Sequence, residues 1–325
     1  MKKIIELFPK LNIAIIGDVM LDIFTYGISE RLSPEAPVPV IRILKKEYCA
    51  GGAGNVAKNL DSLQIKSSVF GVIGNDKNGE MLRNILQSDN IEPKLLCDDS
   101  RPTTVKERII ANQQQMLRVD DESATDTSSE IQQLFCENIC SLIRSKKINA
   151  VIFSDYKKGV LSNSLLEKIV SCANEHNIIT ALDPKPSGIA PIRNLTILKP
   201  NRAEVFELAN MHDDLFADPD TRKNLLLKAA QKVYNDYQPE HLVISLSSDG
   251  LAVYEKDRLV MIPTAAREIF DVSGAGDTLM ASMTAALAAG ANITSAAGIG
   301  NIASGIAVGK RGTSFVTIEE IKQQL

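Results

Sequence analysis

The sequence predicts an α/β fold in which a doubly wound, mostly parallel sheet carries a small β lid. The sheet is predicted by short apolar runs that alternate with helical patterns from residue 127 onward. The lid is predicted by β-rich pieces at 23–48 and 94–120, which interrupt that alternation. In open sheets of this kind, ligands bind at the carboxyl ends of the strands.

The N-terminal half opens with a buried strand, NIAIIGD (12–18), whose polar end is expected to face a site. The next run, PVPVIRILKKEY (37–48), is β-branched, and its prolines suit an edge strand or a projecting flap. The pattern then predicts a helix over 53–63, a strand over 67–74 and a helix over 77–89.

The C-terminal half alternates regularly. Helices are expected at 127–145, 162–176, near 201–210 and at 219–236. Strands are expected at 150–155, 178–183, 195–200 and 241–247, and in LAVYEK and RLVMIP. Two helices rich in alanine and glycine and a final TIEEIKQQL segment close the chain.

Composition excludes several classes of protein. The chain has 325 residues, 44% of them apolar, and a net charge of −4, which argues against a broad nucleic-acid surface. Its five cysteines are odd in number and form no C-x-x-C pair, so we expect reduced thiols in the cytoplasm. No apolar run reaches the roughly 18 residues that a membrane span needs, and no membrane partner is expected.

The stretch DVSGAGD, Asp271 to Asp277, precedes an apolar helical run. The backbone N–H groups of Gly274, Ala275 and Gly276 are candidates to stabilise a transferring phosphoryl group. Asp277 is the candidate general base. A helix-capping role explains Asp277 but not the preceding glycines. The chain has no Walker loop, and no G-x-G-x-x-G follows its first strand.

The segment CAGGAGNVAKNL (49–60) places Gly51 and Gly52 ahead of Asn55 and a helix. Small residues let a compact ligand approach the backbone, and Asn55 can both donate to and accept from hydroxyls. A glycine turn that only starts a helix is an equally good interpretation of this segment alone.

Two further segments suit a nucleotide. KPNRAEV (199–205) places Asn201 and Glu204 on one helix face, where they could hold Mg²⁺ through its water molecules. A helix capping box explains the same pair, and this segment alone favours it. SLSSDG (245–250) ends a strand and suits a nucleotide, or is simply a turn.

In this order GGAGN, NRAE and DVSGAGD resemble the ribokinase-like (phosphofructokinase B) sugar kinases, over about residues 12 to 318. The resemblance implies a Rossmann-like core with a β lid, ATP and Mg²⁺, with Asp277 as base and 274–276 as anion hole. The residues implied for ATP and Mg²⁺ are Asn201, Arg202, Ala203, Glu204, Ser247, Gly250 and Asn301. It also implies a monovalent cation such as K⁺ held by Asp271 and the 307–314 loop, and a homodimer formed through the lid.

Finer segments, namely GDVMLDIFTYG, RLSPEAPVPV, NQQQMLRVD and SDYKKGVL, are similar to kinases that act on O1 of D-glycero-β-D-manno-heptose 7-phosphate. Those kinases make the 1,7-bisphosphate for ADP-heptose and lipopolysaccharide. This similarity implies that Asp18 and Asp22 bind sugar hydroxyls. It also implies that Arg108, Arg118 and Lys158 hold the distal phosphate, with a solvated charge as the alternative for each. The implied substrate residues are completed by Gln115 and Asp155.

Many such kinases carry a fused nucleotidyltransferase with an H-x-G-H motif. This chain has only His176, His212 and His241, none so arranged, and we expect a single kinase domain over 1–325. Two alternatives stay open: a kinase of another sugar, such as ribose or a hexose phosphate, and a non-catalytic sugar- or nucleotide-binding relative. An intact Asp277 and anion-hole sequence speak against the second.

Overall fold

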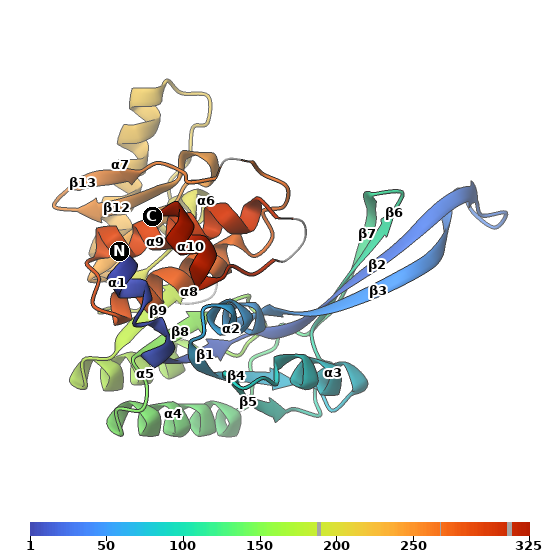
Figure 1. The fold of residues 1–325 in the computed structure, drawn as a ribbon, viewed down its shortest axis with the longest axis horizontal. Coiled ribbons are helices and arrows are strands. Elements are labelled where there is room, and N and C mark those ends of the chain that lie inside the picture. The colour runs from blue at the N-terminus through green and yellow to red at the C-terminus, as the bar shows by residue number, and fades with distance from the viewer. Residues whose placement is uncertain (187–189, 267, 311–313) are drawn as a thin grey trace.

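A long, mostly parallel sheet forms the centre of the structure, with strand order β13-β12-β11-β10-β9-β8-β1-β4-β5 (Figure 1). This computed structural model describes residues 1–325 except 187–189, 267 and 311–313. Pairing is parallel from β11 through β5, whereas β12 and β13 are antiparallel to their neighbours. The strands are β1 (Asn12–Gly17), β4 (Lys66–Ile73), β5 (Ile91–Cys97), β8 (Ala150–Ser154), β9 (Ile179–Asp183), β10 (Ile197–Leu198), β11 (His241–Ser245), β12 (Leu251–Glu255) and β13 (Arg258–Ile262).

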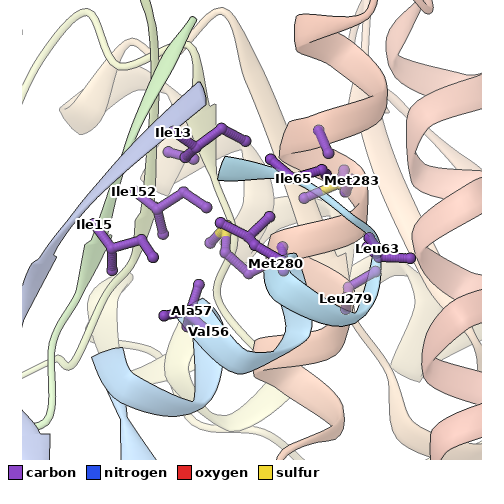
Figure 2. Packing of buried hydrophobic residues seen from close by; sticks show 14 of the residues in the cluster. Ile13, Ile15, Val56, Ala57, Leu63, Ile65, Ile152, Leu279, Met280 and Met283 are labelled. Carbon is purple, nitrogen blue, oxygen red and sulfur yellow. The ribbon is translucent and has the colours of Figure 1, made fainter. Parts of the chain in front are cut away.

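Helices cover both faces of this sheet, so its central strands are continuous apolar runs. In β1, Ile13 and Ile15 pack into one core with α2, α8 and α9, while Ala14 and Ile16 pack into the other with α4, α5 and α7. Figure 2 shows the first core, where Met280 lies between the strands and α2. The helices are α1 (Lys2–Ile5), α2 (Ala53–Ser62), α3 (Lys77–Leu86), α4 (Ser129–Arg144), α5 (Asn163–Glu175), α6 (Arg202–Leu208), α7 (Pro219–Tyr237), α8 (Ala275–Ala288), α9 (Ile293–Val308) and α10 (Ile318–Gln324).

A second sheet projects from the body of the molecule, as Figure 1 shows. Its order is β3-β2-β6-β7, formed by β2 (Val19–Leu32), β3 (Pro39–Gly52), β6 (Val105–Ala111) and β7 (Gln114–Asp121). We call this sheet the lid. The proline-containing β3 lies at its edge, as the sequence predicts.

The predicted α/β fold with a β lid is confirmed, but the lid's bounds need correction. Residues 94–97 lie in β5, which pairs with β4 at the edge of the main sheet. The lid strands β2 and β3 also extend to residues 19 and 52, closer to the core than expected. The predicted strand at 195–200 is reduced to the two residues of β10.

The two faces of the lid differ in chemistry, because residues opposite one another in register share a face. One face carries the rows Cys49–Asp22–Lys106–Asp120 and Glu47–Phe24–Arg108–Arg118, and is densely charged. The opposite face carries the rows Tyr48–Ile23–Glu107–Val119 and Lys46–Thr25–Ile109–Leu117, and is largely apolar. We call these the charged face and the apolar face.

Candidate active site

The carboxyl ends of the parallel strands and the starts of α6 and α8 surround a cavity of about 450 Å³. This is the position that an open α/β sheet offers to a ligand. Predicted residues that line the cavity are Asn201, Glu204, Ser247, Gly250, Gly274, Ala275, Gly276, Asp277 and Asn301. Residues distant in sequence therefore meet at one place.

Helix α8 begins at the cavity with Gly274 as its N-cap. Gly274 has a φ of 75°, in the left-handed region that favours glycine, and a Cβ there would lie 2.7 Å from Asn55 Nδ2. A glycine N-cap offers no side-chain acceptor to the first-turn N–H groups, so the positive helix end can receive an anion. Asp277 is the third residue of the helix, so it is not the N-cap.

The Asp277 carboxylate is buried, and both of its oxygens accept hydrogen bonds. Asn55 Nδ2 donates to Oδ2 at 2.6 Å, and the Tyr156 hydroxyl donates to Oδ1 at 2.9 Å. Burial raises the pKa of Asp277 to about 6, and the Asp183 carboxylate adds to this, while Asn55, Tyr156 and Lys199 act in the opposite direction. A carboxylate whose pKa lies near neutrality is a stronger general base than an ordinary aspartate.

Two lysines line the cavity beside the base. Lys199 is 2% exposed and its Nζ lies 3.0 Å from Asp183 Oδ2, while Asp183 Oδ1 is buried without a hydrogen-bond partner in the described part of the chain. Lys185 pairs with Glu204. Burial lowers the pKa of Lys185, but the carboxylates of Asp183, Glu204 and Asp277 outweigh burial and raise it. Two cations beside an open helix N-terminus can balance the charge of a phosphoryl group.

Asn201 and Glu204 form the capping box that was the alternative interpretation. Glu204 N donates to Asn201 Oδ1 at 2.9 Å, and Asn201 N donates to Glu204 Oε2 at 2.7 Å. Both residues nevertheless line the cavity, so capping and ligand binding are compatible here. Arg202 instead makes a two-pronged ion pair with Asp213 at 2.7 Å, and neither it nor the exposed Ala203 lines the cavity.

Three residues predicted to bind the nucleotide, Ser247, Gly250 and Asn301, also line the cavity. Ser247 begins the 3₁₀ turn Ser247–Asp249 after β11, and Gly250 follows with a φ of 86°. Asn301 of α9 donates to the Pro263 carbonyl at 2.7 Å. Asp271 accepts from Ser273 N at 2.8 Å. Its predicted partner loop, 307–314, lies partly outside the described residues, which end at 310 and resume at 314.

The predicted sugar-side residues lie where the lid joins the core. Gly51 and Gly52 end β3, and a Cβ on Gly51 would lie 2.2 Å from Asp22 Oδ2. Asp22 accepts from Arg108 Nη1 at 2.5 Å, on the charged face of the lid. Asn55, at the start of α2, connects this region to Asp277. The lid residues and the base therefore adjoin one another.

Asp18 and Asp155 are both buried, directly after β1 and β8. Asp18 is 1% exposed and accepts from the backbone N–H groups of Tyr156, Lys158 and Val160 at 2.8, 3.0 and 3.3 Å. Burial raises the pKa of Asp18. Burial also raises the pKa of Asp155, to about 6. Neither residue lines the cavity. In this structure Asp18 holds the loop that follows β8, and its contact with a sugar hydroxyl stays a prediction.

The cations expected to bind a distal phosphate already have acidic partners. Arg118 Nε and Nη2 lie 2.9 and 3.0 Å from the two oxygens of Asp120, and Lys158 pairs with Glu122. Lys106, which the sequence analysis did not single out, lies 3.1 Å from both acids. Gln115 is exposed on β7. A phosphate bound here must therefore compete with or rearrange these carboxylates.

Comparison with known proteins decides the family. The sequence profile of the pfkB family carbohydrate kinases matches residues 10–320. This chain belongs to the PfkB family of carbohydrate kinases. It is therefore a phosphotransferase that acts on an alcohol group, and it has the family's ribokinase-like fold.

Curated relatives of this PfkB kinase are longer than the chain. It is 38% identical over 311 residues to the bifunctional protein HldE of Helicobacter pylori (strain P12), which covers 95% of the chain and 66% of that protein. It is 38% identical over 322 residues to the HldE of Sulfurimonas denitrificans, covering 99% and 65% respectively. The chain thus spans about 65% of the length of these curated relatives.

Solved structures support the fold. Arabidopsis thaliana ribokinase complexed with ribose and ATP has a TM-score of 0.71 at 17% identity, covering 97% of this chain and 98% of that one. Escherichia coli phosphofructokinase-2 in complex with substrates and products has a TM-score of 0.75 at 18% identity, covering 96% and 97%. No helix within the described part of the PfkB kinase is long and apolar enough to cross a membrane.

Among the cavity residues of this PfkB kinase that the sequence analysis did not single out, four have titratable side chains: Tyr156, Asp183, Lys185 and Lys199. Each follows or ends a parallel strand, at β8, β9 or β10. Polar residues directly after predicted buried strands were the available signal, in SDYKK, LDPKP and LKPN. That signal gives candidates, but only the sheet order shows which of them share a cavity.

Substituting Glu204 with Gln tests its proposed contribution to Mg²⁺ binding. Gln can still accept the Asn201 N–H bond, but it removes the anionic charge that faces Lys185 and the cavity. We expect the Mg²⁺ concentration for half-maximal rate to rise by at least about tenfold, because one lost charge-assisted contact is worth roughly 1.5–3 kcal/mol. Steady-state rates over an Mg²⁺ titration measure this.

Glu320→Gln is a matched control, because Glu320 caps α10 and pairs with Lys310 in the same way. If the melting temperature falls but the Mg²⁺ concentration for half-maximal rate does not change, then Glu204 acts only as a helix cap.

Proposed function

We propose that this PfkB kinase transfers the γ-phosphoryl group of ATP to O1 of D-glycero-β-D-manno-heptose 7-phosphate, giving the 1,7-bisphosphate for ADP-heptose and lipopolysaccharide synthesis. The observation that carries the proposal is the buried Asp277 at the open N-terminus of α8, hydrogen-bonded to Asn55 of α2, the helix that directly follows the lid strand β3. The relatives named HldE support the choice of sugar, as do the lid segments that resemble heptose kinases. ATP as donor fits a cytoplasmic enzyme.

The chain's own residues account for the main chemical requirements. Asp277 removes the proton of the attacking hydroxyl, and its raised pKa suits that step. The N–H groups of the first turn of α8 stabilise the charge on the transferred group. Lys185 and Lys199 supply positive charge at the same wall of the cavity. Asp22, Asn55 and Arg108 hold the sugar between the lid and the core.

The residues present fit Mg²⁺. Glu204 and Asn201 line the cavity with oxygen atoms, and Asp183 Oδ1 is buried without a partner among the described residues. Hard oxygen donors of this kind suit an Mg²⁺ ion whose other ligands are water and phosphate. When bound, the ion neutralises charge on the phosphates. For K⁺, the Asp271 carboxylate is the candidate ligand in the described part of the chain.

A panel of acceptors tests the assignment through ADP release. Heptose 7-phosphate, free heptose, ribose and fructose 6-phosphate are compared at equal ATP and Mg²⁺. If another sugar is phosphorylated in preference, the kinase assignment holds and the assignment of heptose 7-phosphate as substrate is wrong. No turnover with any acceptor, despite measured nucleotide binding, would favour the non-catalytic relative.

The apolar face of the lid supports the proposal that two chains pair through their lids. Tyr48, Leu117 and Val119 lie on this face and are 41%, 54% and 46% exposed. Exposed apolar residues gathered on one sheet face are typical of a surface that another protein covers. The charged face remains turned to the substrate, so pairing through the apolar face leaves the cavity accessible.

Leu117→Lys combined with Val119→Lys is expected to convert a dimer into a monomer. Two charges placed in an apolar interface lose hydration without gaining partners. Sedimentation velocity at micromolar concentration measures the change. Phe216→Lys serves as the control, because Phe216 is 100% exposed in the connection between α6 and α7, away from the lid. A wild-type chain that sediments as a monomer would refute the lid dimer.

A further inference from the structure

The loop after β8 places a tyrosine against the proposed base. The Tyr156 hydroxyl donates a hydrogen bond to Asp277 Oδ1 at 2.9 Å, and Asn55 donates to the other oxygen, Oδ2. The two donors come from different elements, the β8 loop and α2, and together they fix the plane of the carboxylate. In the proposed reaction Asp277 removes a proton and Asn55 helps to hold the sugar, whereas Tyr156 has had no role so far.

Asp18 holds this loop in place. Its Oδ2 accepts from Tyr156 N at 2.8 Å and from Lys158 N at 3.0 Å, and its Oδ1 accepts from Val160 N at 3.3 Å. A buried carboxylate that accepts three backbone N–H groups is a strong constraint, because each bond is charge-assisted. Asp18 directly follows β1, a buried strand that lies between β8 and β4 in the main sheet, so the loop is anchored to the interior of that sheet.

The charges around the tyrosine favour its neutral, donating form. Burial raises the pKa of Tyr156 well above 10, and the carboxylates of Asp277, Asp183 and Asp22 act in the same direction. The Lys185 ammonium, 5.8 Å from the centre of its ring, acts in the opposite direction. Because burial and the three carboxylates outweigh it, Tyr156 stays in its neutral, donating form near neutral pH.

We propose that Tyr156 is a positioning residue for the base, held by Asp18, whose hydroxyl orients the Asp277 carboxylate and stabilises its ionised form. The inference rests on the proposed function, in which Asp277 accepts the proton of the sugar hydroxyl. The proton moves from the hydroxyl to Asp277, and Tyr156 keeps its own proton throughout. Each carboxylate oxygen has two lone pairs, so one remains for the substrate after Asn55 and Tyr156 have donated.

Tyr156→Phe tests this directly, since it removes one oxygen atom and keeps the ring. Of the groups facing Asp277, which also include Asp183, Lys199 and Asn55, only the Tyr156 donor is lost. Its loss raises the pKa of Asp277, so the acidic limb of the kcat/KM profile should move up by about one pH unit. Lys185, whose pKa Asp277 raises, also faces the carboxylate and is unchanged by this substitution. A one-unit shift from about 6 lowers the rate about fivefold at pH 6 and leaves it nearly unchanged above pH 8. Tyr254→Phe is the matched control, because Tyr254 also donates to an aspartate, Asp257 at 2.7 Å, outside the cavity.

A second readout separates this proposal from the proposed function. The Asp277 carboxyl is titrated by NMR in protein labelled with ¹³C-aspartate, its signal assigned from Asp277→Asn, without any substrate. An upward shift in Tyr156→Phe supports the proposal, and an unmoved titration overturns it even if sugar kinase activity is confirmed. Absence of kinase activity in the wild type would overturn the proposed function and leave the titration readable. Asp18→Asn, which loosens the loop but keeps Tyr156, should shift the same signal in the same direction. It provides the test if Tyr156→Phe does not fold.

Discussion

Replacing Asp277 with Asn is expected to reduce turnover by about 10²–10⁴-fold, the usual contribution of a general base. Asn is nearly the same size, and its oxygen can still accept from the Tyr156 hydroxyl. It cannot take a proton from a sugar hydroxyl at neutral pH. Because the first turn of α8 and the two lysines remain, binding of ATP and sugar should persist, and the loss should fall on kcat.

Two measurements make that result specific. Steady-state kinetics give kcat and KM, and calorimetric titration of nucleotide gives binding to the free enzyme. Asp257→Asn is the matched control, since Asp257 accepts a tyrosine hydroxyl as Asp277 does but lies at the β12–β13 turn. A variant at position 277 that keeps a kcat within a few fold of the wild type would remove Asp277 from the mechanism.

The sequence motif around Asp277 predicted its structure well because the information is local. A glycine that adopts a positive φ, a small residue and an acid ahead of an apolar run specify a helix start with a free N-terminus. The alternation of strands and helices likewise predicted the parallel sheet, since apolar periodicity reports burial directly. These features depend on neighbouring residues only.

The cavity's other charges could not be predicted in the same way. Lys185 and Lys199 meet Asp277 only because β9 and β10 are neighbours in the sheet, and strand order is not a local property. The loop contacts of Asp18 are also non-local. The sequence places Asp18 at a strand end, but the three N–H groups that it accepts from belong to a loop about 140 residues away in sequence.

Capping and function also overlap at α6, where sequence alone presented them as alternatives. The Asn201–Glu204 pair closes both bonds of a capping box, and Glu204 still reaches Lys185 at the cavity. Arg202, one residue along the same motif, points to Asp213 instead. Helical geometry places residues three apart on one face and adjacent residues on different faces. Neighbouring residues of one sequence motif can therefore have different partners.

Heptose 7-phosphate is expected to exceed free heptose by at least tenfold in kcat/KM, because one or more charge-assisted bonds to the phosphate are worth roughly 1.5–3 kcal/mol each. Arg108 and Arg118 lie opposite one another on the charged face of the lid, with Lys106 and Asp120 in the neighbouring row. These cations are paired with Asp22, Asp120 and Glu122. The phosphate must displace a carboxylate partner from them, which sets the expected gain at the lower end of that range.

The anomeric hydroxyl is the expected acceptor, because it is more acidic than other sugar hydroxyls and therefore suits a carboxylate base. The discrimination between phosphorylated and free heptose should shrink in Arg108→Ala and in Arg118→Ala, since each leaves the phosphate with one cation fewer. Arg258→Ala removes a cation from β13, an edge strand of the main sheet that is not part of the lid, and should leave the ratio unchanged. Measuring kcat/KM for both sugars in all four proteins gives the result. Equal use of the free sugar by the wild type, or a preference for ribose or fructose 6-phosphate, would exclude heptose 7-phosphate while leaving the kinase assignment intact.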